Sequence, residues 1–317
     1  TFLFLFSGSV YGQEEVKKEY WDNGKLKSET HYKNGIKEGL ETGWYESGRK
    51  EYETPYKNGK KDGLSTKFSP YSGDIETHYK NGKKEGLETE WHFPGKKSKW
   101  FETPWKNGKK EGLATGWYES GKKQGEIHYK NDSKEVIKIW YESGFKKKEF
   151  FKYKNGNEGL STEWYESDQK KSEVPYKNGK KDGLFTAWYE SGQKKSEVPY
   201  KNWEKEWGVK DGLETVWYES GNKKSEVHWK NGSQDGLEKG WYESGRKKYV
   251  YHYKNGKKDG LESHWRESGR KSIESHWKNR SQVQTFWYKS GEKQSETHFK
   301  NGRQEGLETV WYESGKK

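Results

Sequence analysis

Apolar and polar residues alternate with a period of two through short segments of this chain. In one of them, Leu213, Thr215 and Trp217 alternate with Glu214 and Val216. Successive side chains of a β-strand point to opposite faces of a sheet, whereas an amphipathic helix would repeat its apolar positions every three to four residues. The pattern therefore predicts strands.

Two kinds of turn signal separate these segments. Asn-Gly follows one segment, as at Asn231-Gly232, and Ser-Gly follows the next, as at Ser220-Gly221. Both dipeptides suit tight turns, because glycine and asparagine tolerate a left-handed backbone. Strand, turn and strand should therefore follow one another as hairpins.

The hairpins are copies of one unit. An aromatic residue opens the same phrase mostly every 24 residues, as between Trp164 and Trp188. Three repeat columns define the unit: a Trp column with Trp164, Trp188, Trp217 and Trp241, a Leu column with Leu184, Leu213 and Leu237, and a column with Tyr176, Tyr200 and Trp229. A fixed period in this range predicts an array of stacked units without a central core.

The pairing register depends on the length of the turns. Two-residue loops would set Thr215 opposite Glu226. Three-residue loops, Glu-Ser-Gly and Lys-Asn-Gly with a left-handed glycine, instead pair Leu213 with Val227 and collect the apolar columns on one face. We therefore expect type I turns that end in a glycine bulge, with the Trp, Tyr, Leu and Thr columns on the same face.

The predicted fold is all-β: an open, twisted, single-layer antiparallel meander over residues 13–317. It should contain about 12–13 hairpins, or about 25 strands. Hydrophobic residues make up only 27% of the chain, a fraction typical of disordered segments. The 18 Trp and 23 Tyr residues, placed in register, can stack along the sheet and supply the missing apolar contact area.

Residues 1–12 differ from the repeats. Thr1–Phe6 are apolar, and small residues follow up to Gly12, which is typical of the end of a secretory signal. This predicts a secreted or surface-exposed protein whose mature chain begins near Gln13. The alternative is an ordinary apolar first strand in a cytoplasmic protein.

The sequence argues against an enzyme. Seven of the nine histidines share one repeat column, which includes His228, and Pro199 occupies that column in another copy. The column therefore requires neither a base nor a metal ligand. No cysteine is present, and turns account for the many glycines. We expect no catalytic residues, no metal site and no cofactor.

The net charge of +12 raises the question of an anionic partner. Lysines concentrate in the Lys-Asn-Gly-Lys-Lys turns, and Glu or Asp lies near each cluster, which favours a solvated rim and argues against nucleic acid. An anionic membrane surface, or a glycan stacked on Tyr and Trp rings, remains an alternative partner.

One copy carries five additional residues after Tyr200. The insertion brings in Trp203 and Trp207, and an exposed loop with two tryptophans would be a suitable anchor for a protein partner. The alternative is that both rings fold back over the sheet. An open meander also leaves unpaired backbone groups on its first and last strands, which predicts end-to-end dimers or filaments.

The phrases Tyr-Lys-Asn-Gly-Lys-Lys-Asp-Gly-Leu and Trp-Tyr-Glu-Ser-Gly-Lys-Lys resemble MORN-variant repeats, as found in bacterial proteins labelled YwqK-family antitoxins. The resemblance covers residues 19–317 and implies a scaffold for protein contacts, or in some cases lipid contacts, without catalytic residues. We therefore expect a non-enzymatic scaffold that binds a partner protein through an aromatic-lined sheet. The alternatives are an antitoxin-like inhibitor of a toxin, a carbohydrate or anionic-lipid binder, and a self-assembling filament subunit.

Overall fold

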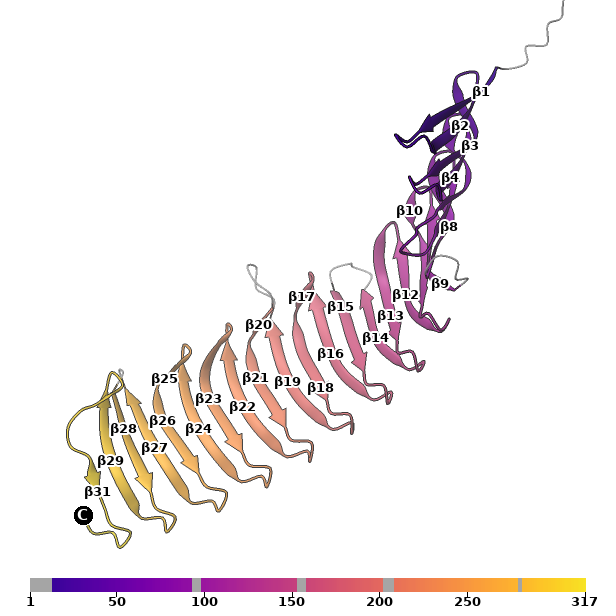
Figure 1. Ribbon diagram of the computed structural model, residues 1–317. Helices are drawn as coiled ribbons and strands as arrows, with labels where there is room; N and C mark the ends of the chain where they lie inside the picture. Colours follow the sequence, from indigo (N-terminus) through magenta and orange to yellow (C-terminus); the bar gives the residue numbers. More distant parts are fainter. Residues whose placement is uncertain (1–12, 93–97, 153–157, 202–207, 279–280) are drawn as a thin grey trace, which may run out of the picture. The chain divides into compact units, whose positions relative to one another are not determined.

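The computed structural model describes residues 13–92, 98–152, 158–201, 208–278 and 281–317. Every regular element in these ranges is a β-strand, which confirms the predicted fold class (Figure 1). The chain divides into two compact units, Thr1–Phe145 and Lys146–Lys317. Within each unit, strands that are consecutive in sequence pair antiparallel, and the resulting sheet is open.

The strand bounds follow the repeat. The first unit contains β1 (Glu14–Tyr20), β2 (Leu26–Lys33), β3 (Ile36–Trp44), β4 (Lys50–Lys57), β5 (Lys60–Lys61), β6 (Gly63–Lys67), β7 (Ile75–Lys80), β8 (Lys83–Trp91), β9 (Lys99–Lys106), β10 (Lys109–Lys110), β11 (Gly112–Trp117), β12 (Lys123–Lys130) and β13 (Ser133–Trp140). The second unit contains β14 (Lys146–Lys152), β15 (Glu158–Trp164), β16 (Lys170–Lys177), β17 (Lys180–Lys181), β18 (Gly183–Trp188), β19 (Lys194–Lys201), β20 (Val209–Lys210), β21 (Gly212–Trp217), β22 (Lys223–Lys230), β23 (Ser233–Trp241), β24 (Lys247–Lys254), β25 (Lys257–Lys258), β26 (Gly260–Trp265), β27 (Lys271–Lys278), β28 (Ser281–Trp287), β29 (Lys293–Lys300), β30 (Arg303–Gln304) and β31 (Thr309–Val310).

The described residues therefore contain more strands than the roughly 25 that the sequence predicts. A bulge divides one segment of several repeats into two strands. In the first unit, Asp62 separates β5 from β6, and its N–H donates to the Pro55 carbonyl oxygen at 3.0 Å. Both short strands still pair with β4, so the order of strands in the meander is unchanged.

The Ser-Gly turns have the predicted geometry. The Gly221 N–H donates to the Tyr218 carbonyl oxygen at 3.0 Å, and Tyr218 N–H donates to the Asn222 carbonyl oxygen at 2.8 Å. Gly221 has φ of 88°, in the left-handed region. This is a three-residue loop in which a type I turn ends in a glycine bulge.

The expectation for the Asn-Gly turns is wrong. Lys230 lies directly opposite Ser233, so the loop contains only two residues. Asn231 and Gly232 both have positive φ, 51° and 81°, as a type I′ turn requires. The type I′ turn is favoured because its backbone twist matches the right-handed twist of the flanking strands, and asparagine tolerates the left-handed region.

Because the Asn-Gly loops contain two residues and not three, the pairing register of the strands differs from the prediction. Leu213 lies opposite His228 and Thr215 lies opposite Glu226, with a bulge between Val216 and Trp217. The Leu and Trp columns therefore share one face, which we call the leucine face. The column with Trp229 lies on the opposite face, which we call the tyrosine face, so the prediction that one face collects all aromatic columns is wrong.

Packing between neighbouring strands relies on large and small partners. On the tyrosine face, Gly43 lies opposite Tyr52, and a Cβ at Gly43 would lie 2.3 Å from the Tyr52 Cε1 atom. Gly240 with Tyr249 repeats this arrangement. In another repeat the same two positions hold Val216 and Ser225. A glycine thus accommodates an aromatic ring, and a larger residue accompanies a serine.

A second set of hydrogen bonds, donated by side chains, joins consecutive repeats along the edge of the sheet that the Ser-Gly turns form. We call this edge the Ser-Gly edge, and the opposite one the Asn-Gly edge. The Tyr218 hydroxyl donates to the Trp241 carbonyl oxygen at 3.0 Å, and Tyr242 donates to Trp265 in the same way at 2.8 Å. Where the Tyr is replaced, another donor takes its part: Trp21 Nε1 donates to Trp44 at 3.0 Å, and Arg266 Nη2 donates to Trp287 at 3.0 Å. In most copies a side-chain donor in this column thus reaches the next repeat, whereas the Ser69 hydroxyl bonds to Ser72 in its own turn.

Candidate binding surfaces

The aromatic rings of the tyrosine face are held by charged neighbours. Lys210 Nζ lies 4.6 Å from the centre of the Trp229 ring and 2.7 Å from Glu214 Oε2. The Trp229 indole N–H donates to the same carboxylate at 2.7 Å. Lysine, glutamate and tryptophan thus form a closed group that covers the ring and fixes its position.

The leucine face combines covered rings with exposed leucines. Lys194 Nζ lies 6.0 Å from the centre of the Trp217 ring and 2.6 Å from Glu197 Oε1. The neighbouring leucines have no such cover. We define the leucine strip as the leucines of the Leu column that lie in strands and are 41–49% exposed: Leu40, Leu64, Leu87 and Leu113 in the first unit, and Leu184 and Leu213 in the second. Leu307, in the same column, is 92% exposed but lies outside the strands.

The sequence alone does not reveal this exposure, because a regular apolar column usually indicates a core. Among the described residues, the buried hydrophobic side chains are only Ala114, Tyr129, Val174 and Val198. No second layer covers the leucines in the described parts of either unit. The strip is therefore an apolar contact surface.

The Asn-Gly edge carries a different surface. In several repeats the carboxylate before Gly-Leu accepts a backbone hydrogen bond from the next repeat: Asn81 N–H donates to Asp62 Oδ2 at 2.9 Å, and Asn107 N–H donates to Glu85 Oε2 at 2.6 Å. The acidic residues near the Lys-Asn-Gly-Lys-Lys turns therefore bind the turns of their neighbours.

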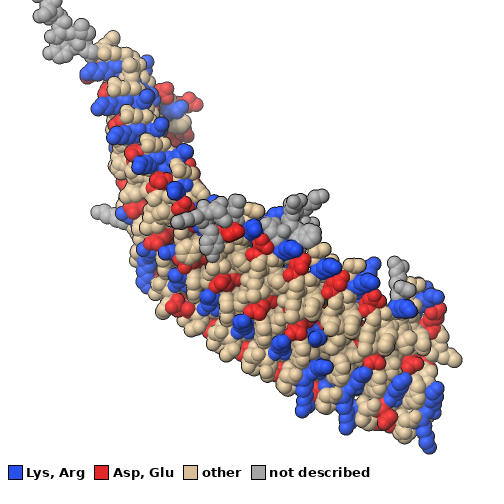
Figure 2. All heavy atoms as spheres, turned by 180° about the vertical axis from the view of Figure 1, so that it is seen from behind, with Lys and Arg blue, Asp and Glu red and all other residues tan. Residues whose placement is uncertain are grey.

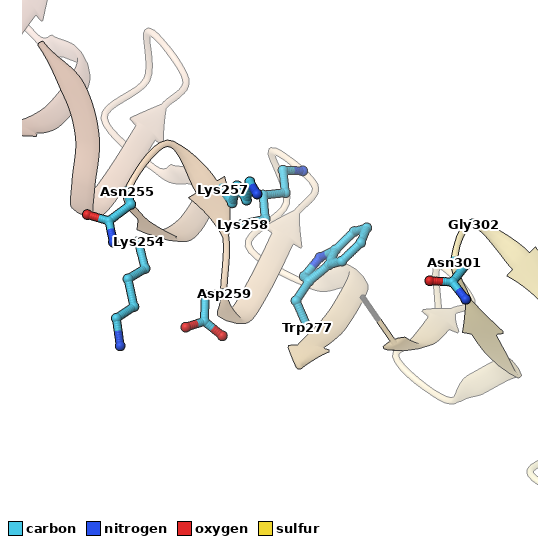
Figure 3. A pocket seen from close by; sticks show the side chains of 8 residues that line it. All are labelled: Lys254, Asn255, Lys257, Lys258, Asp259, Trp277, Asn301 and Gly302. Carbon is cyan, nitrogen blue, oxygen red and sulfur yellow. The ribbon is translucent and has the colours of Figure 1, made fainter. Parts of the chain in front are cut away.

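A depression of about 890 Å³ lies on this edge in the second unit. Its lining residues are Lys254, Asn255, Lys257, Lys258, Asp259, Trp277, Asn301 and Gly302. In the view of Figure 3, the side chains of Lys254 and Asp259 extend downward, whereas that of Lys258 extends upward. The charged groups diverge, so this depression does not bring an acid and a base together on a substrate.

A smaller hollow of about 500 Å³ lies on the tyrosine face of the first unit, between Tyr56 and Tyr79. It forms where Ser65 occupies the position of Glu214 in the repeat. Burial and a hydrogen bond to Glu41 raise the pKa of Tyr56 to about 12, so its hydroxyl remains protonated at neutral pH. The Lys61 ammonium lies 5.1 Å from the Tyr79 ring centre and covers part of the stacking surface that a sugar would need.

The strongest carboxylate shift belongs to Glu262. Burial opposes its ionisation, but hydrogen bonds from His264, Lys258 and Trp277 together lower its pKa to about 2. Its Oε2 atom lies 3.0 Å from Lys258 Nζ and 2.9 Å from Trp277 Nε1. Glu262 is therefore an ionised partner within the closed group of its own repeat, with a structural role.

The predictions for the individual site residues fare differently. Trp203 and Trp207 lie outside the described residues, so the proposed anchor remains a prediction. The repeat columns through Trp217 and Trp229 are present in their strands, on opposite faces. Within the described ranges, no group of three or more His, Cys, Asp or Glu residues is arranged to hold a metal ion. In these same ranges, no helix is long and apolar enough to span a bilayer.

Comparison with known proteins identifies the repeat. A family model described as MORN repeat variant matches residues 16–34, 37–58, 110–131, 157–178, 181–202, 210–231, 234–255 and 283–301. No curated protein matches the chain. A solved structure titled "Crystal Structure of TcdB2-TccC3-TEV" aligns with 92% of this chain and 20% of its own, at 8% identity and a TM-score of 0.18. This chain thus spans a fifth of the length of that structure's chain.

Proposed function

The chain belongs to the MORN repeat variant family, and from this premise we propose that it is a non-enzymatic scaffold that binds a partner protein through the leucine strip. Proteins with MORN repeats are in general non-catalytic scaffolds that often bind proteins or membranes. The leucine strip supports a protein partner because exposed apolar residues recur at one register position.

The geometry of the strip favours an extended contact. Leu64 and Leu87 stand at equivalent positions of consecutive repeats, two strands apart, so their spacing along the sheet is about 9.6 Å. Each leucine lies beside Pro or His of the paired strand, as Leu64 lies opposite His78. A partner helix or strand that lies across the repeats would bury several leucines at once, and interface energy concentrates in such apolar anchors.

The accessible surface agrees with this proposal. The chain exposes 20953 Å². A compact protein of its mass would expose roughly 14,000 Å². The excess is of the size that a single-layer sheet leaves uncovered on its two faces, and a partner that covers part of one face would bury a standard interface.

The test compares two variants of the full chain. Leu64→Gln, Leu87→Gln and Leu113→Gln together remove three of the four strip leucines of the first unit. A control carries Tyr71→Ser and Tyr312→Ser, at exposed aromatic residues outside the strip that are 89% and 70% exposed. Tagged chains are used to capture proteins from the native source, with quantification by mass spectrometry.

We expect a partner that the native chain and the control retain in near-stoichiometric amount and that the leucine variant loses at least about tenfold. Equal retention by both variants would refute the leucine strip as the contact. A single toxic partner held one to one would in addition favour the antitoxin hypothesis.

Export is a separate proposal, supported by the apolar residues Thr1–Phe6 and the small residues that follow. Amino-terminal sequencing of the protein recovered from outside the cells should begin near Gln13. Recovery of the chain only from the cytoplasm would refute it.

A further inference from the structure

Three consecutive repeats of the first unit place lysine directly opposite lysine beside the Asn-Gly turn. The pairs are Lys57 with Lys60, Lys80 with Lys83, and Lys106 with Lys109. All six side chains are exposed, and within the described residues none is within ion-pair distance of a carboxylate or stands over an aromatic ring. We call these six residues the lysine strip, and we propose that it binds a linear anionic polysaccharide.

Backbone bonds between repeats hold the strip in a row. The Gly82 N–H donates to the Lys61 carbonyl oxygen at 2.8 Å, and the Gly108 N–H donates to the Lys84 carbonyl oxygen at 2.9 Å. Each turn is thereby attached to the turn before it. The pairs follow one another at about 9.6 Å, twice the distance between adjacent strands. Figure 2 shows Lys and Arg side chains of the N-terminal unit in successive parallel rows.

In the described part of the chain, the nearby acidic groups form no ion pair with the six lysines of the strip. Asp62 and Glu85 accept hydrogen bonds from the Asn81 and Asn107 backbone N–H groups. Lysines on the faces are paired differently: Lys37 lies 2.9 Å from Glu41 and 4.8 Å from the Tyr56 ring centre. The structure thus separates lysines that hold the fold together from lysines that do not.

Stability does not explain the lysine strip, because like charges directly opposite each other on paired strands are destabilising. The fold does not require lysine there. Ser133, Ser233 and Ser281 occupy the position of Lys60 in other repeats, opposite Lys130, Lys230 and Lys278. An anionic ligand that lies along the edge can form ion pairs with these lysines, because no carboxylate of the described residues does so.

The charge spacing selects the ligand class. Two charges per repeat give about one positive charge every 5 Å along the edge. Duplex DNA carries one negative charge per about 1.7 Å. An extended polysaccharide with one anionic group on each sugar residue matches the wider spacing. Proteins that bind single-stranded nucleic acid also offer aromatic rings to the bases, and the lysine strip and its Asn-Gly turns contain none.

The experiment uses the full chain and a variant with Lys60→Ser, Lys83→Ser and Lys109→Ser, which copies the serines of the other repeats. A matched control carries Lys122→Ser, Lys289→Ser and Lys316→Ser, three exposed lysines at Ser-Gly turns. The probes are heparin, polygalacturonate, neutral dextran and single-stranded DNA. Affinities are measured by calorimetry over a series of salt concentrations around 0.1 M, where charge interactions act over about 10 Å.

We expect the native chain and the control to bind heparin and polygalacturonate but not dextran. The strip variant should lose at least tenfold in affinity, and the slope of log K against log salt should fall by about two to three, because three cations are removed. A variant with Lys60→Arg, Lys83→Arg and Lys109→Arg keeps the charges and should retain binding. This variant also separates the loss of charge from a loss of fold.

Equal losses in the strip variant and in the control would overturn the proposal, since they would indicate attraction to net charge alone. Tighter binding of DNA than of both polysaccharides would also overturn it. The lysine strip lies at the edge of the sheet and the leucine strip on its face, so either contact can fail in these tests while the other stands.

Discussion

The pairing of Gly43 with Tyr52 offers a direct test of how neighbouring strands pack. A Cβ at Gly43 would lie 2.3 Å from the Tyr52 ring, so Gly43→Val forces the ring out of place. Overpacking of this kind costs about 1–3 kcal/mol. Tyr52→Ser alone uncovers the backbone at Gly43 and loses the buried ring area, at a cost of about 1–2 kcal/mol.

The double variant Gly43→Val with Tyr52→Ser reproduces the combination that Val216 and Ser225 form in another repeat. We expect it to be within about 1 kcal/mol of the native chain, because valine also suits a strand better than glycine. The coupling energy between the two positions should therefore be about 2 kcal/mol, with each substitution compensating for the destabilisation that the other causes.

The assay is amide hydrogen exchange of the full chain, followed by mass spectrometry of peptides from β3 and β4. Local protection is the appropriate measure, because a repeat array does not unfold in one cooperative step. The reverse exchange, Val216→Gly with Ser225→Tyr, is the matched control and should show the same rescue. If the destabilisation of the double variant equals the sum of the two single destabilisations within about 0.5 kcal/mol, the packing argument is refuted.

Three further predictions concern single hydrogen-bonded groups. Tyr218→Phe removes the bond to the Trp241 carbonyl oxygen and should reduce local stability by about 1 kcal/mol, measured as faster hydrogen exchange in β22 and β23. Asp62→Ala leaves the Asn81 N–H without its acceptor, and the exchange of that amide should accelerate while distant repeats stay unchanged. Glu262 has its pKa lowered from 4.5 to about 2, so its ionised form stabilises the fold above about pH 4.5, and this contribution is lost as the pH falls toward 2. Glu262→Gln should therefore reduce local stability by about 1–2 kcal/mol at pH 7, a value limited by solvent screening. The difference from the native chain should shrink on acidification when both are compared at each pH by amide hydrogen exchange of peptides from β26 and β27. A difference that is independent of pH would contradict this assignment.

Local sequence signals predict the strands and the hairpins well, because turn chemistry acts within a few residues. The Ser-Gly loop ending at Gly221 follows from its sequence alone. The register is harder to predict. The predicted register assumes that the apolar columns share one face of the sheet. This assumption holds for sheets that cover a core. A single-layer sheet has two solvated faces, and the chain distributes its rings over both.

Some of the missed features do have a sequence signal. The column of Tyr218 holds Trp21, Ser69, His92 or Arg266 in other copies, and these residues share only the ability to donate an N–H or O–H. That common property indicates a bond to a fixed acceptor. In the same way, glycine opposite an aromatic residue and valine opposite serine vary together between Gly43–Tyr52 and Val216–Ser225.

Other features could not be predicted from one sequence. A leucine in a regular column normally indicates burial, and only the three-dimensional arrangement reveals that Leu64 remains 44% exposed. The separation of paired from unpaired lysines likewise depends on which donor each carboxylate binds. Asp62 lies next to Lys61 in the sequence, yet it binds the Asn81 backbone in the following repeat.

At least seven tyrosines of the Ser-Gly edge donate forward to the same backbone position one copy further on, as Tyr218 does to Trp241 and Tyr242 does to Trp265. Donor and acceptor are therefore interchangeable from copy to copy. Excising or duplicating one whole period would bring an identical acceptor to the orphaned hydroxyl. The length of such an array can therefore change in steps of one repeat without any new contact having to evolve.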